Sequence, residues 1–266
     1  MNNVLVVIPH YNDINGLRDS ILSIQDDVDI LVIDDGSIQK PDNDYFSSFI
    51  KGSQKLFFII NTTNRGISYC LNRGIDYFFK KNYTYFARLD AGDRNIGPRF
   101  AIQKNYLEEN MDIGFCGSYV RCYDINSKFI SNIILPCDHE LIIKKMYLYN
   151  CFIHPSIMIR KNALQLMGYY PINYLALEDY YFFWNSLKKV KAANINKFLL
   201  IYTISSNSIS TKKRLIQSIN KFRLSIKMCD FSLLSIFGII KNFMLIFFTR
   251  SLANRIKKLF KFGGHE

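Results

Sequence analysis

Three features that would mark particular protein classes are absent from this sequence of 266 residues. It has no short internal repeat, so a solenoid is not expected. The chain runs at once into VLVVIPHYND (4–13), without the basic region or small-residue cleavage site of a secretory signal. Its six cysteines form no Cys-x-x-Cys pair, so we expect reduced, mostly buried thiols. The predicted compartment is the cytoplasm.

Acidic residues are scarce in the last part of the chain. Residues 211–266 hold twelve Lys and Arg against only Asp230 and Glu266, which is a net charge of +10 out of +12 for the whole chain. A basic excess can indicate nucleic-acid binding, but this one adjoins the apolar run FSLLSIFGIIKNFMLIFF (231–248). Basic residues beside bulky apolar ones favour an anionic membrane surface over a phosphate groove, so no nucleic-acid partner is expected.

The composition, with 49% hydrophobic and 21% charged residues, is that of a chain with a sizeable core. Apolar strand-like segments alternate with helix-like segments through the first half. This alternation indicates an α/β fold with a mostly parallel sheet covered on both faces. In such sheets ligands bind outside the carboxyl ends of the strands. Strands are predicted at 4–8, 30–34, 55–60, 85–89 and 113–120, and helices at 16–24, 67–79 and 99–109.

Three loops after predicted strands carry chemistry. PHYND (9–13) offers the Tyr11 ring for stacking on a base, although an ordinary turn and helix cap is an equal alternative. DDGS (34–37) places two acids, poor core residues, where a carboxylate can accept hydrogen bonds from a uracil N–H or ribose hydroxyls. RLDAGDR (88–94) has acids three apart beside arginines, which suits a divalent cation and a diphosphate; a surface turn with local ion pairs is the alternative.

The order of the motifs resembles glycosyltransferase family 2. IPHYND, IDDGS, NRGISYCLNRGI, ARLDAGD, HPSIMIRK with a following GYY, and LEDYYFFW occur in succession. The resemblance covers roughly residues 3–205 and implies the GT-A fold, a Rossmann-like, mostly parallel sheet with helices on both faces. We expect a GT-A catalytic domain at 1–210 and a helical, membrane-associating extension at 211–266.

The resemblance also implies roles for individual residues. A nucleotide sugar would contact Pro9, Tyr11, Asp35, Asn64, Gly66, Arg88 and Asp90. Mn²⁺ or Mg²⁺ would bind Asp93 and Asp90, and Asp179 would be the base that takes the proton from the acceptor hydroxyl. The acceptor side would include Glu178, His154 and Trp184, the only tryptophan. A structural role is an equal alternative for His154 and for Trp184.

The implied reaction is an inverting transfer of one sugar from a nucleotide sugar, because a single base opposite the leaving group requires in-line attack. A UDP-sugar is favoured over dTDP- or GDP-sugars, and the transferred unit is a hexose or an N-acetylhexosamine. The acceptor would be a hydroxyl of a glycan or lipid-linked precursor of surface polysaccharide, such as O-antigen, capsule or lipopolysaccharide. The Q-x-x-R-W signature of processive polymerases is absent, so one sugar is expected per encounter.

Two departures from the family pattern coincide. Many relatives read D-x-D-D where this chain has Gly92, and many carry a late histidine where it has YTIS (202–205). Both departures weaken the expected metal site. They motivate one alternative function, a catalytically degenerate nucleotide-sugar-binding partner in a membrane assembly complex, whereas the intact Asp179 argues for an enzyme.

The apolar segment 231–249 is nearly long enough to span a bilayer, but Lys241 close to its centre offsets the apolar contribution. We therefore expect a helix that lies on the membrane, with a spanning helix and a helix packed on the catalytic domain as alternatives. An anionic membrane surface would be contacted through 231–261. The predicted location is cytoplasmic and peripheral, on the inner face of the cell membrane.

Overall fold

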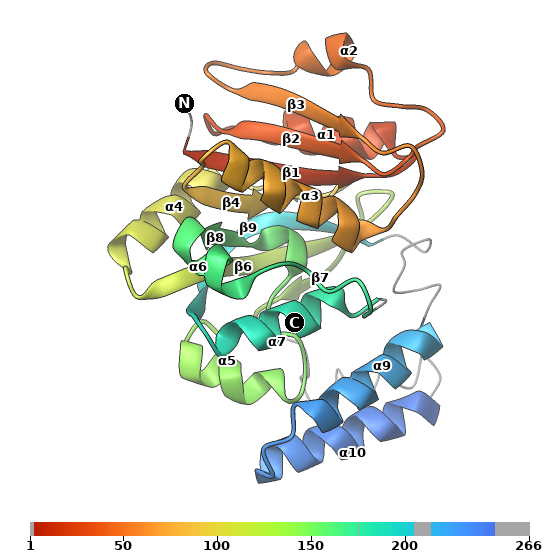
Figure 1. The fold of residues 1–266 in the computed structure, drawn as a ribbon, viewed down its shortest axis with the longest axis vertical. Helices are drawn as coiled ribbons and strands as arrows, with labels where there is room; N and C mark the ends of the chain where they lie inside the picture. The colour runs from red at the N-terminus through yellow and green to blue at the C-terminus, as the bar shows by residue number, and fades with distance from the viewer. Residues whose placement is uncertain (1–2, 175, 205–213, 248–266) are drawn as a thin grey trace.

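The computed structural model describes residues 3–174, 176–204 and 214–247 (Figure 1). At its centre lies one nine-stranded sheet in the order β3-β2-β1-β4-β8-β6-β9-β5, with β7 paired to β6. The strands are β1 (Val4–His10), β2 (Asp29–Asp34), β3 (Lys55–Ile60), β4 (Tyr85–Arg88), β5 (Arg94–Asn95), β6 (Ile113–Asp124), β7 (Phe129–Ile133), β8 (Met158–Arg160) and β9 (Lys191–Ile204).

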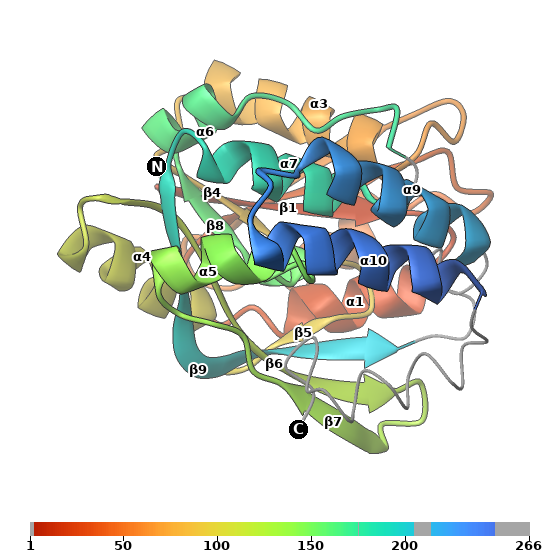
Figure 2. The same cartoon turned by 90° about the horizontal axis from the view of Figure 1, so that it is seen from below.

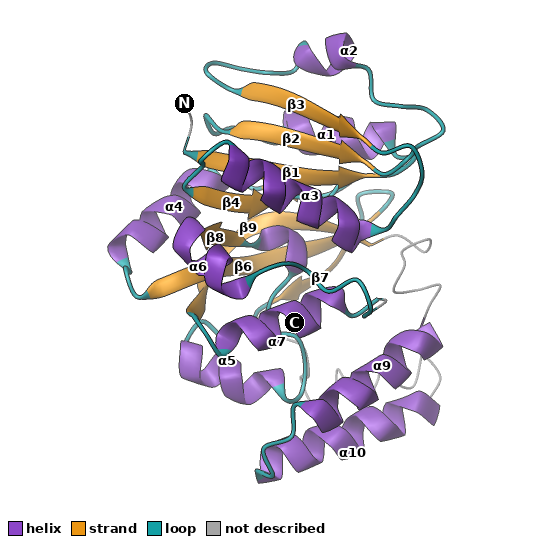
Figure 3. Cartoon of the chain, viewed as in Figure 1, coloured by secondary structure: helices purple, strands orange, loops and turns teal. Residues whose placement is uncertain are grey.

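The helices lie on both faces of this sheet, as Figure 3 shows by colour. They are α1 (Ile14–Leu22), α2 (Asn43–Ser47), α3 (Ile67–Lys80), α4 (Arg99–Glu109), α5 (His139–Met146), the 3-10 turn η1 (His154–Ser156), α6 (Lys161–Met167), α7 (Glu178–Leu187), α9 (Arg214–Lys227) and α10 (Leu233–Phe247). All eight predicted strands and helices are present, with ends shifted by a few residues. The predicted set did not include strands β5, β7, β8 and β9 or helices α2, α5 and α6.

The sheet has two halves of different pairing. In the first half β1 pairs in parallel with both β2 and β4, and β2 pairs in parallel with β3. In the second half β8 runs antiparallel between β4 and β6, while β6 and β9 are again parallel. Strands β5 and β7 add antiparallel edges. The predicted Rossmann-like, mostly parallel GT-A sheet is confirmed. The antiparallel strands β5, β7 and β8 were not part of that prediction.

Two apolar cores, one on each face, hold the layers together. Leu5 and Val7 of β1 point into a core shared with α3, α5, α6 and α7. Val6 and Ile8 of the same strand point into the opposite core, which includes side chains of α1, α2 and α4. Because successive side chains of a strand alternate between faces, a strand buried on both sides is continuously apolar. All six cysteines are unpaired, and four of them are buried, as the sequence predicted.

The C-terminal helices α9 and α10 lie side by side beneath α7 and α5 (Figure 2). The buried positions of α10 are Ser235, Gly238 and Asn242, whereas most of its large apolar side chains are exposed. Among the helices that the structure describes, none is long and apolar enough to cross a bilayer. The predicted basic contact at 250–261 lies outside the described residues.

Candidate active site

The loops after β1 and β2 are joined by a buried network around Asp34. His10 Nδ1 is 2.8 Å from Asp34 Oδ1, and His10 Nε2 accepts the backbone N–H of Asp13 at 3.1 Å. The histidine is therefore a neutral imidazole that donates from Nδ1 to the carboxylate. Ser37 donates its backbone N–H to Asp34 Oδ2 at 3.0 Å. Both acids of DDGS are buried although acids are poor core residues, and in Asp34 these partners satisfy the carboxylate in a fully buried position.

Asp35 organises the loop that follows β3. Its carboxylate accepts hydrogen bonds from Asn61 Nδ2 at 2.9 Å and from the backbone N–H groups of Arg65 at 2.9 Å and Gly66 at 2.8 Å. Gly66 has a φ of +88°, in the left-handed region, and no atom lies within 4 Å of an added Cβ. Asp35 thus fixes the backbone at the start of α3 from the end of β2.

The other predicted nucleoside contacts lie along the same edge of the sheet. Tyr11 follows β1 and is 51% exposed, so its ring is available to a ligand. Asn64 is exposed in the loop before α3, and Pro9 is half-buried at the end of β1. Asn12 connects this edge to the DDGS loop, because its side chain accepts the Ile38 N–H at 2.8 Å.

A neighbouring pocket of about 390 Å³ gathers five titratable residues of the predicted site, although Asp35 and Asp93 do not line it. It brings together side chains from β4, α7, β9 and α9 and from the segment around η1. Arg88, Asp90, His154, Glu178 and Asp179 were predicted, and all five line the pocket. The remaining lining residues are Ile67, Asn150, Phe152, Ile153, Pro155, Ala176, Tyr202 and Gln217.

Arg88 is the buried cation of this pocket. Its Nε and Nη2 donate to the two carboxylate oxygens of Asp90 at 2.8 and 3.1 Å. Arg99, itself fully buried, donates from Nη2 to the Arg88 carbonyl at 2.7 Å. Among the described residues, Arg88 Nη1 has no hydrogen-bond partner although it is buried. A buried guanidinium N–H without a partner can serve an anionic ligand.

Asp93 is held from two sides of its loop. Its Oδ1 accepts the Thr203 N–H at 2.8 Å, and Thr203 Oγ1 donates to the Gly92 carbonyl at 2.6 Å. From α1, Ser20 Oγ donates toward the Asp93 carbonyl at 2.7 Å and accepts the Gly92 N–H at 3.0 Å. Burial and the negative charge of Asp90 raise the pKa of Asp93 well above its usual value. The loop is therefore fixed by α1 and β9, two elements distant in sequence.

The two acids predicted to bind a divalent cation are placed differently, since Asp90 lines the pocket and pairs with Arg88 whereas Asp93 is buried outside the pocket lining. Asp93 Oδ2 is buried and, within the described ranges, has no hydrogen-bond partner, while Asp90 lines the pocket. Mg²⁺ is commonly bound through one or two carboxylates plus substrate phosphates. No group of three or more His, Cys, Asp and Glu side chains suited to a metal occurs in the part of the chain that the structure describes.

Asp179, the predicted base, lies in the first turn of α7. Its Oδ2 accepts a hydrogen bond from Asn150 Nδ2 at 2.9 Å, and its Oδ1 accepts the N–H of Tyr180 at 2.7 Å. Burial raises the pKa of Asp179 above its usual value, against the lowering effects of the Tyr180 N–H, Arg88 and Lys221. A carboxylate with a raised pKa accepts a proton more readily, as a general base must.

Glu178 and His154 lie beside Asp179 in the same pocket. Burial, followed by the charge of Asp179, raises the pKa of Glu178. Burial, followed by the charge of Arg88, lowers the pKa of His154 well below its usual value, so the imidazole is neutral. The His154 ring packs against Tyr170 and Phe183, and its Nε2 has no partner among the described side chains. His154 therefore combines a packing role with one unused polar atom.

Trp184 is not brought to the pocket. It is 8% exposed, packs edge-on against the Tyr147 ring with centroids 5.0 Å apart, and lies beneath the Lys188 ammonium. Its position in α7 is two turns beyond Glu178, on the side of the helix that faces the core. The predicted acceptor-side role is thus replaced by the core role, the alternative that the sequence left open.

Four residues that shape the site were missed by the sequence prediction. Asn150 donates a hydrogen bond to the Asp179 carboxylate, and Ser20 donates to backbone carbonyls of the Asp90–Asp93 loop. Tyr202 and Gln217 line the pocket. None of them stands in a recognisable motif except Tyr202, which begins the YTIS segment. They reach the site only because distant elements meet there.

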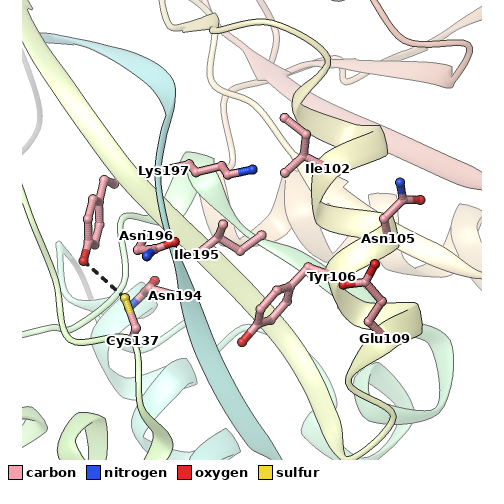
Figure 4. Close-up of a pocket in the computed structure, with 10 residues that line it drawn as sticks. Ile102, Asn105, Tyr106, Glu109, Cys137, Asn194, Ile195, Asn196 and Lys197 are labelled. Atoms are coloured by element: carbon pink, nitrogen blue, oxygen red, sulfur yellow. Dashed lines mark hydrogen bonds between the residues drawn. The ribbon is translucent and has the colours of Figure 1, made fainter.

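A second, larger cavity of about 660 Å³ lies away from these residues, between α4 and β9 (Figure 4). Its lining includes Tyr106, Glu109, Asn194 and Lys197, and none of the predicted site residues. The Asn194 amide donates to the carbonyls of Pro136 and Cys151 at 2.8 and 2.9 Å. Asn194 therefore supports the backbone beneath the cavity.

Comparison with known proteins agrees with this arrangement. Residues 5–168 match the family model described as Glycosyl transferase family 2. The bifunctional glycosyltransferase pgtA of Dictyostelium discoideum is 26% identical over 240 residues, which is 76% of this chain and 31% of pgtA. The O-antigen biosynthesis glycosyltransferase WbnJ of Escherichia coli is 30% identical over 126 residues, 46% of this chain and 48% of WbnJ. The chain thus spans less than half the length of either relative.

Solved structures share the fold. S. aureus TarS 1-349 in complex with UDP-GlcNAc has a TM-score of 0.65 at 13% identity, covering 97% of this chain and 76% of that chain. The mannosyltransferase PcManGT from Pyrobaculum calidifontis in complex with GDP-Man and Mn²⁺ has a TM-score of 0.63 at 13% identity, covering 97% and 75%. Both have the GT-A fold, and the family match covers more than half of the sequence. The chain belongs to glycosyltransferase family 2.

Proposed function

We propose that this glycosyltransferase moves one hexose or N-acetylhexosamine from a UDP-sugar to a hydroxyl group with inversion at the anomeric carbon. The observation that supports this most is the pocket in which Arg88 and the base Asp179 line the same space. Arg88 supplies positive charge for a leaving diphosphate, and Asp179 supplies a carboxylate for the attacking hydroxyl. Each serves one of the two partners in the transfer.

The base is prepared for proton transfer by its surroundings. Asn150 donates to Oδ2 of Asp179 at 2.9 Å and fixes the orientation of the carboxylate. Oδ1 of Asp179 accepts a hydrogen bond from the N–H of Tyr180, so the carboxylate is fixed at the start of α7. Asp179 removes the proton as the acceptor oxygen attacks, a contribution typically worth about 10²–10⁴ in rate. A single base acting opposite the leaving group gives inversion.

The leaving nucleotide carries the charge that the enzyme must stabilise. Within the part of the chain that the structure describes, Nη1 of Arg88 has no partner and can donate to the diphosphate, while Nε and Nη2 donate to Asp90. When bound, Mn²⁺ or Mg²⁺ would neutralise diphosphate charge, held by Asp90 and Asp93. At the other end of the nucleotide, Tyr11 would stack on the base. Asp35 would act on the nucleoside through the backbone that it fixes at Gly66.

The acceptor is proposed to be a glycan or lipid-linked hydroxyl in the synthesis of surface polysaccharide, of the O-antigen, capsule or lipopolysaccharide type. The similarity to WbnJ, an O-antigen biosynthesis glycosyltransferase, supports this class of pathway. UDP is proposed as the nucleotide ahead of dTDP and GDP, in keeping with the UDP complex of TarS. TarS binds UDP-GlcNAc and PcManGT binds GDP-Man, so these donors define the range to test.

A donor panel tests the proposal directly. Thermal stability of the purified protein is measured with UDP-, dTDP- and GDP-sugars, with and without Mn²⁺, and release of the nucleotide is followed. At about 100 times Kd a bound donor should add roughly 2.7 kcal/mol to the free energy of unfolding. We expect a UDP-sugar to bind and its sugar to be transferred slowly to water, which releases UDP. Tight binding without release would instead favour the alternative of a non-catalytic nucleotide-sugar-binding partner.

The role of the metal is tested at Asp93. We expect Asp93→Ala to lose metal-dependent donor binding, because Asp93 supplies one of the two carboxylates at the proposed cation site. The measurement is donor affinity at increasing Mn²⁺ and Mg²⁺, and wild-type protein should need high concentrations of either ion. Asp112→Ala, which removes an exposed acid outside the site, is the control. Full activity after exhaustive chelation would show that Arg88 and backbone amides suffice.

A peripheral position on the inner face of the cell membrane is proposed from the orientation of α10. Its outward residues include Leu233, 89% exposed, and Ile240, 55% exposed, while Ser235, Gly238 and Asn242 are buried. An amphipathic helix with its apolar face outward can insert into the headgroup region of a bilayer. The sequence that follows adds Arg250, Arg255, Lys257, Lys258 and Lys261, which suit anionic lipids at about 1 kcal/mol each near the surface.

Liposome flotation tests this membrane contact. Full-length protein and protein ending at residue 230 are mixed with vesicles of phosphatidylcholine alone or with phosphatidylglycerol, at low and high salt. We expect only full-length protein to float with anionic vesicles, and part of the binding to survive high salt because it is apolar. Absence of flotation at low salt would mean that the outward face meets a protein instead.

A further inference from the structure

Helix α9 supplies part of the wall of the catalytic pocket. Gln217, in its first turn, lines the pocket together with Asp179 and Glu178. The Gln217 Nε2 donates a hydrogen bond to the carbonyl of Ala176 at 3.1 Å. This bond joins a helix from the C-terminal part of the chain to the segment just before α7.

Ala176 has a special backbone conformation. Its φ is +59°, in the left-handed region that costs a residue with a Cβ more than it costs glycine. Two residues later the chain enters α7 at Glu178, and Asp179 follows. The direction in which the base enters the pocket therefore depends on the backbone at Ala176, whose carbonyl is held by Gln217.

The C-terminal half of α9 packs against the domain and against α10, which anchors the helix that carries Gln217. Leu224 and Met228, at the end of the helix, are buried in the core that α7 shares. Lys227 Nζ contacts the hydroxyls of Tyr174 and Tyr181 at 3.1 and 3.4 Å. The Phe222 ring packs against Phe243 of α10, with centroids 5.3 Å apart. Helix α9 thus joins the outward-facing helix α10 to the segment that leads to the base.

We infer that Gln217 is a positioning residue for the transfer reaction, holding the Ala176 carbonyl so that Asp179 meets the acceptor hydroxyl. The inference rests on the proposed function, in which Asp179 is the base. It assigns to α9 a task in the reaction itself, in addition to any contact with a membrane. A misplacement of a catalytic group by about 1 Å can cost 10²-fold in rate, so the loss of one such bond is measurable.

The test compares three variants by steady-state release of UDP from the UDP-sugar found in the donor panel, with water as acceptor. Gln217→Ala removes the donor, and we expect kcat to fall about 10-fold while the donor KM stays within about 2-fold. Ala176→Gly in the same chain should restore most of kcat, because glycine adopts a positive φ without the Cβ penalty. Arg223→Gln, an exposed change on α9, is the control and should leave kcat unchanged.

Each outcome decides the inference. A fall in kcat with unchanged donor KM and thermal midpoint, reversed by Ala176→Gly, supports the positioning role. Wild-type kcat in Gln217→Ala overturns it, and so does an equal loss in the double variant, which would mean a role other than holding Ala176. If wild-type protein binds a UDP-sugar but releases no UDP, the proposed function is refuted instead. Donor affinity of Gln217→Ala is then compared with that of wild type, and a change in this affinity would contradict the positioning role.

Discussion

Helices α7 and α10 use their apolar residues in opposite ways. In α7 the apolar side chains Phe182, Phe183 and Leu187 are buried, and the acids of its first turn face the pocket. In α10 the buried residues are small or polar, and most of the large apolar residues are exposed. Both helices carry many large apolar side chains, so their presence alone does not show which of them are buried.

The buried apolar residues of α7 contribute to the free energy of folding, whereas the exposed ones of α10 can contribute to the free energy of binding another surface. The apolar side chains of α7 are removed from water when the chain folds, so they stabilise the domain. The exposed apolar side chains of α10 remain in water after folding, so their burial can stabilise only a complex with a membrane or another protein. The approach of α10 to the domain depends on Gly238, where an added Cβ would lie 2.4 Å from the Tyr147 carbonyl oxygen. Four substitutions test this contrast, in order of decreasing effect.

The largest effect is expected from Phe183→Ala in α7. This ring is fully buried and packs against Phe115 and Phe152, so its removal leaves a cavity. Loss of about 3–5 kcal/mol in the free energy of unfolding is expected. Phe247→Ala in α10, where the ring is 72% exposed, is the matched control and should cost less than about 0.5 kcal/mol. Denaturant unfolding measures both, and equal losses would contradict the contrast.

The second effect belongs to the polar end of α7. Asp179→Asn should lower transfer by at least about 10²-fold while donor affinity stays near that of wild type. The free energy of unfolding should fall only slightly, because a half-buried carboxylate with a raised pKa is replaced by a neutral amide of the same shape that keeps one of the two accepted hydrogen bonds. Initial rates and donor binding measured on the same preparation check this. Near-wild-type turnover would remove Asp179 from the mechanism.

The loops that follow the parallel strands could be predicted from the sequence. The apolar strand-like segments located them, and parallel strands bring their carboxyl ends to one edge. The roles of Arg88, Asp90 and Asp179 were implied by the resemblance to the family. Arg88 and Asp90 do line the same pocket as Asp179. For Asp35 the sequence indicated the place but not the partners, since its hydrogen bonds to residues 61–66 depend on the packing of two loops.

The sequence could not indicate contacts made by residues that lie far apart in the chain. Asn150 and Gln217 are ordinary amides in segments without a motif, and only the fold brings them to Asp179 and Ala176. Likewise, Asp34 is buried because His10 and Ser37 happen to surround it. A lone tryptophan such as Trp184 fits a sugar site and a core equally well until its neighbours are known.

The third effect is on membrane binding by α10. Ile240→Ser removes one outward apolar side chain, whose full burial would contribute about 1.5–3 kcal/mol. We expect about a 10-fold weaker partition into anionic vesicles and little change in the free energy of unfolding. Val190→Ser, at a half-buried position that packs against the core, should show the reverse pattern. A change in stability without a change in flotation would mean that α10 serves the fold.

The smallest effect is expected on the pH dependence of the base. Lys221 of α9 lowers the pKa of Asp179, together with Arg88 of β4, against burial, which raises it. Lys221→Met should therefore raise the pKa of Asp179. Since the base works only when ionised, the acid limb of the rate profile should move to higher pH. Arg223→Gln removes an exposed charge from the same helix and should leave the profile in place, and an unmoved profile in Lys221→Met would contradict the effect.

The loop conformation at Gly92 restricts how this chain can change by mutation. Gly92 has a φ of +97°, and Ser20, Asp93 and Thr203 hold the backbone around it. An aspartate here would recreate the D-x-D-D pattern of many relatives. It would also place a Cβ in a left-handed conformation at a cost of roughly 1–2 kcal/mol. A single Gly92→Asp substitution is therefore expected to destabilise the loop unless its anchors on α1 and β9 change as well.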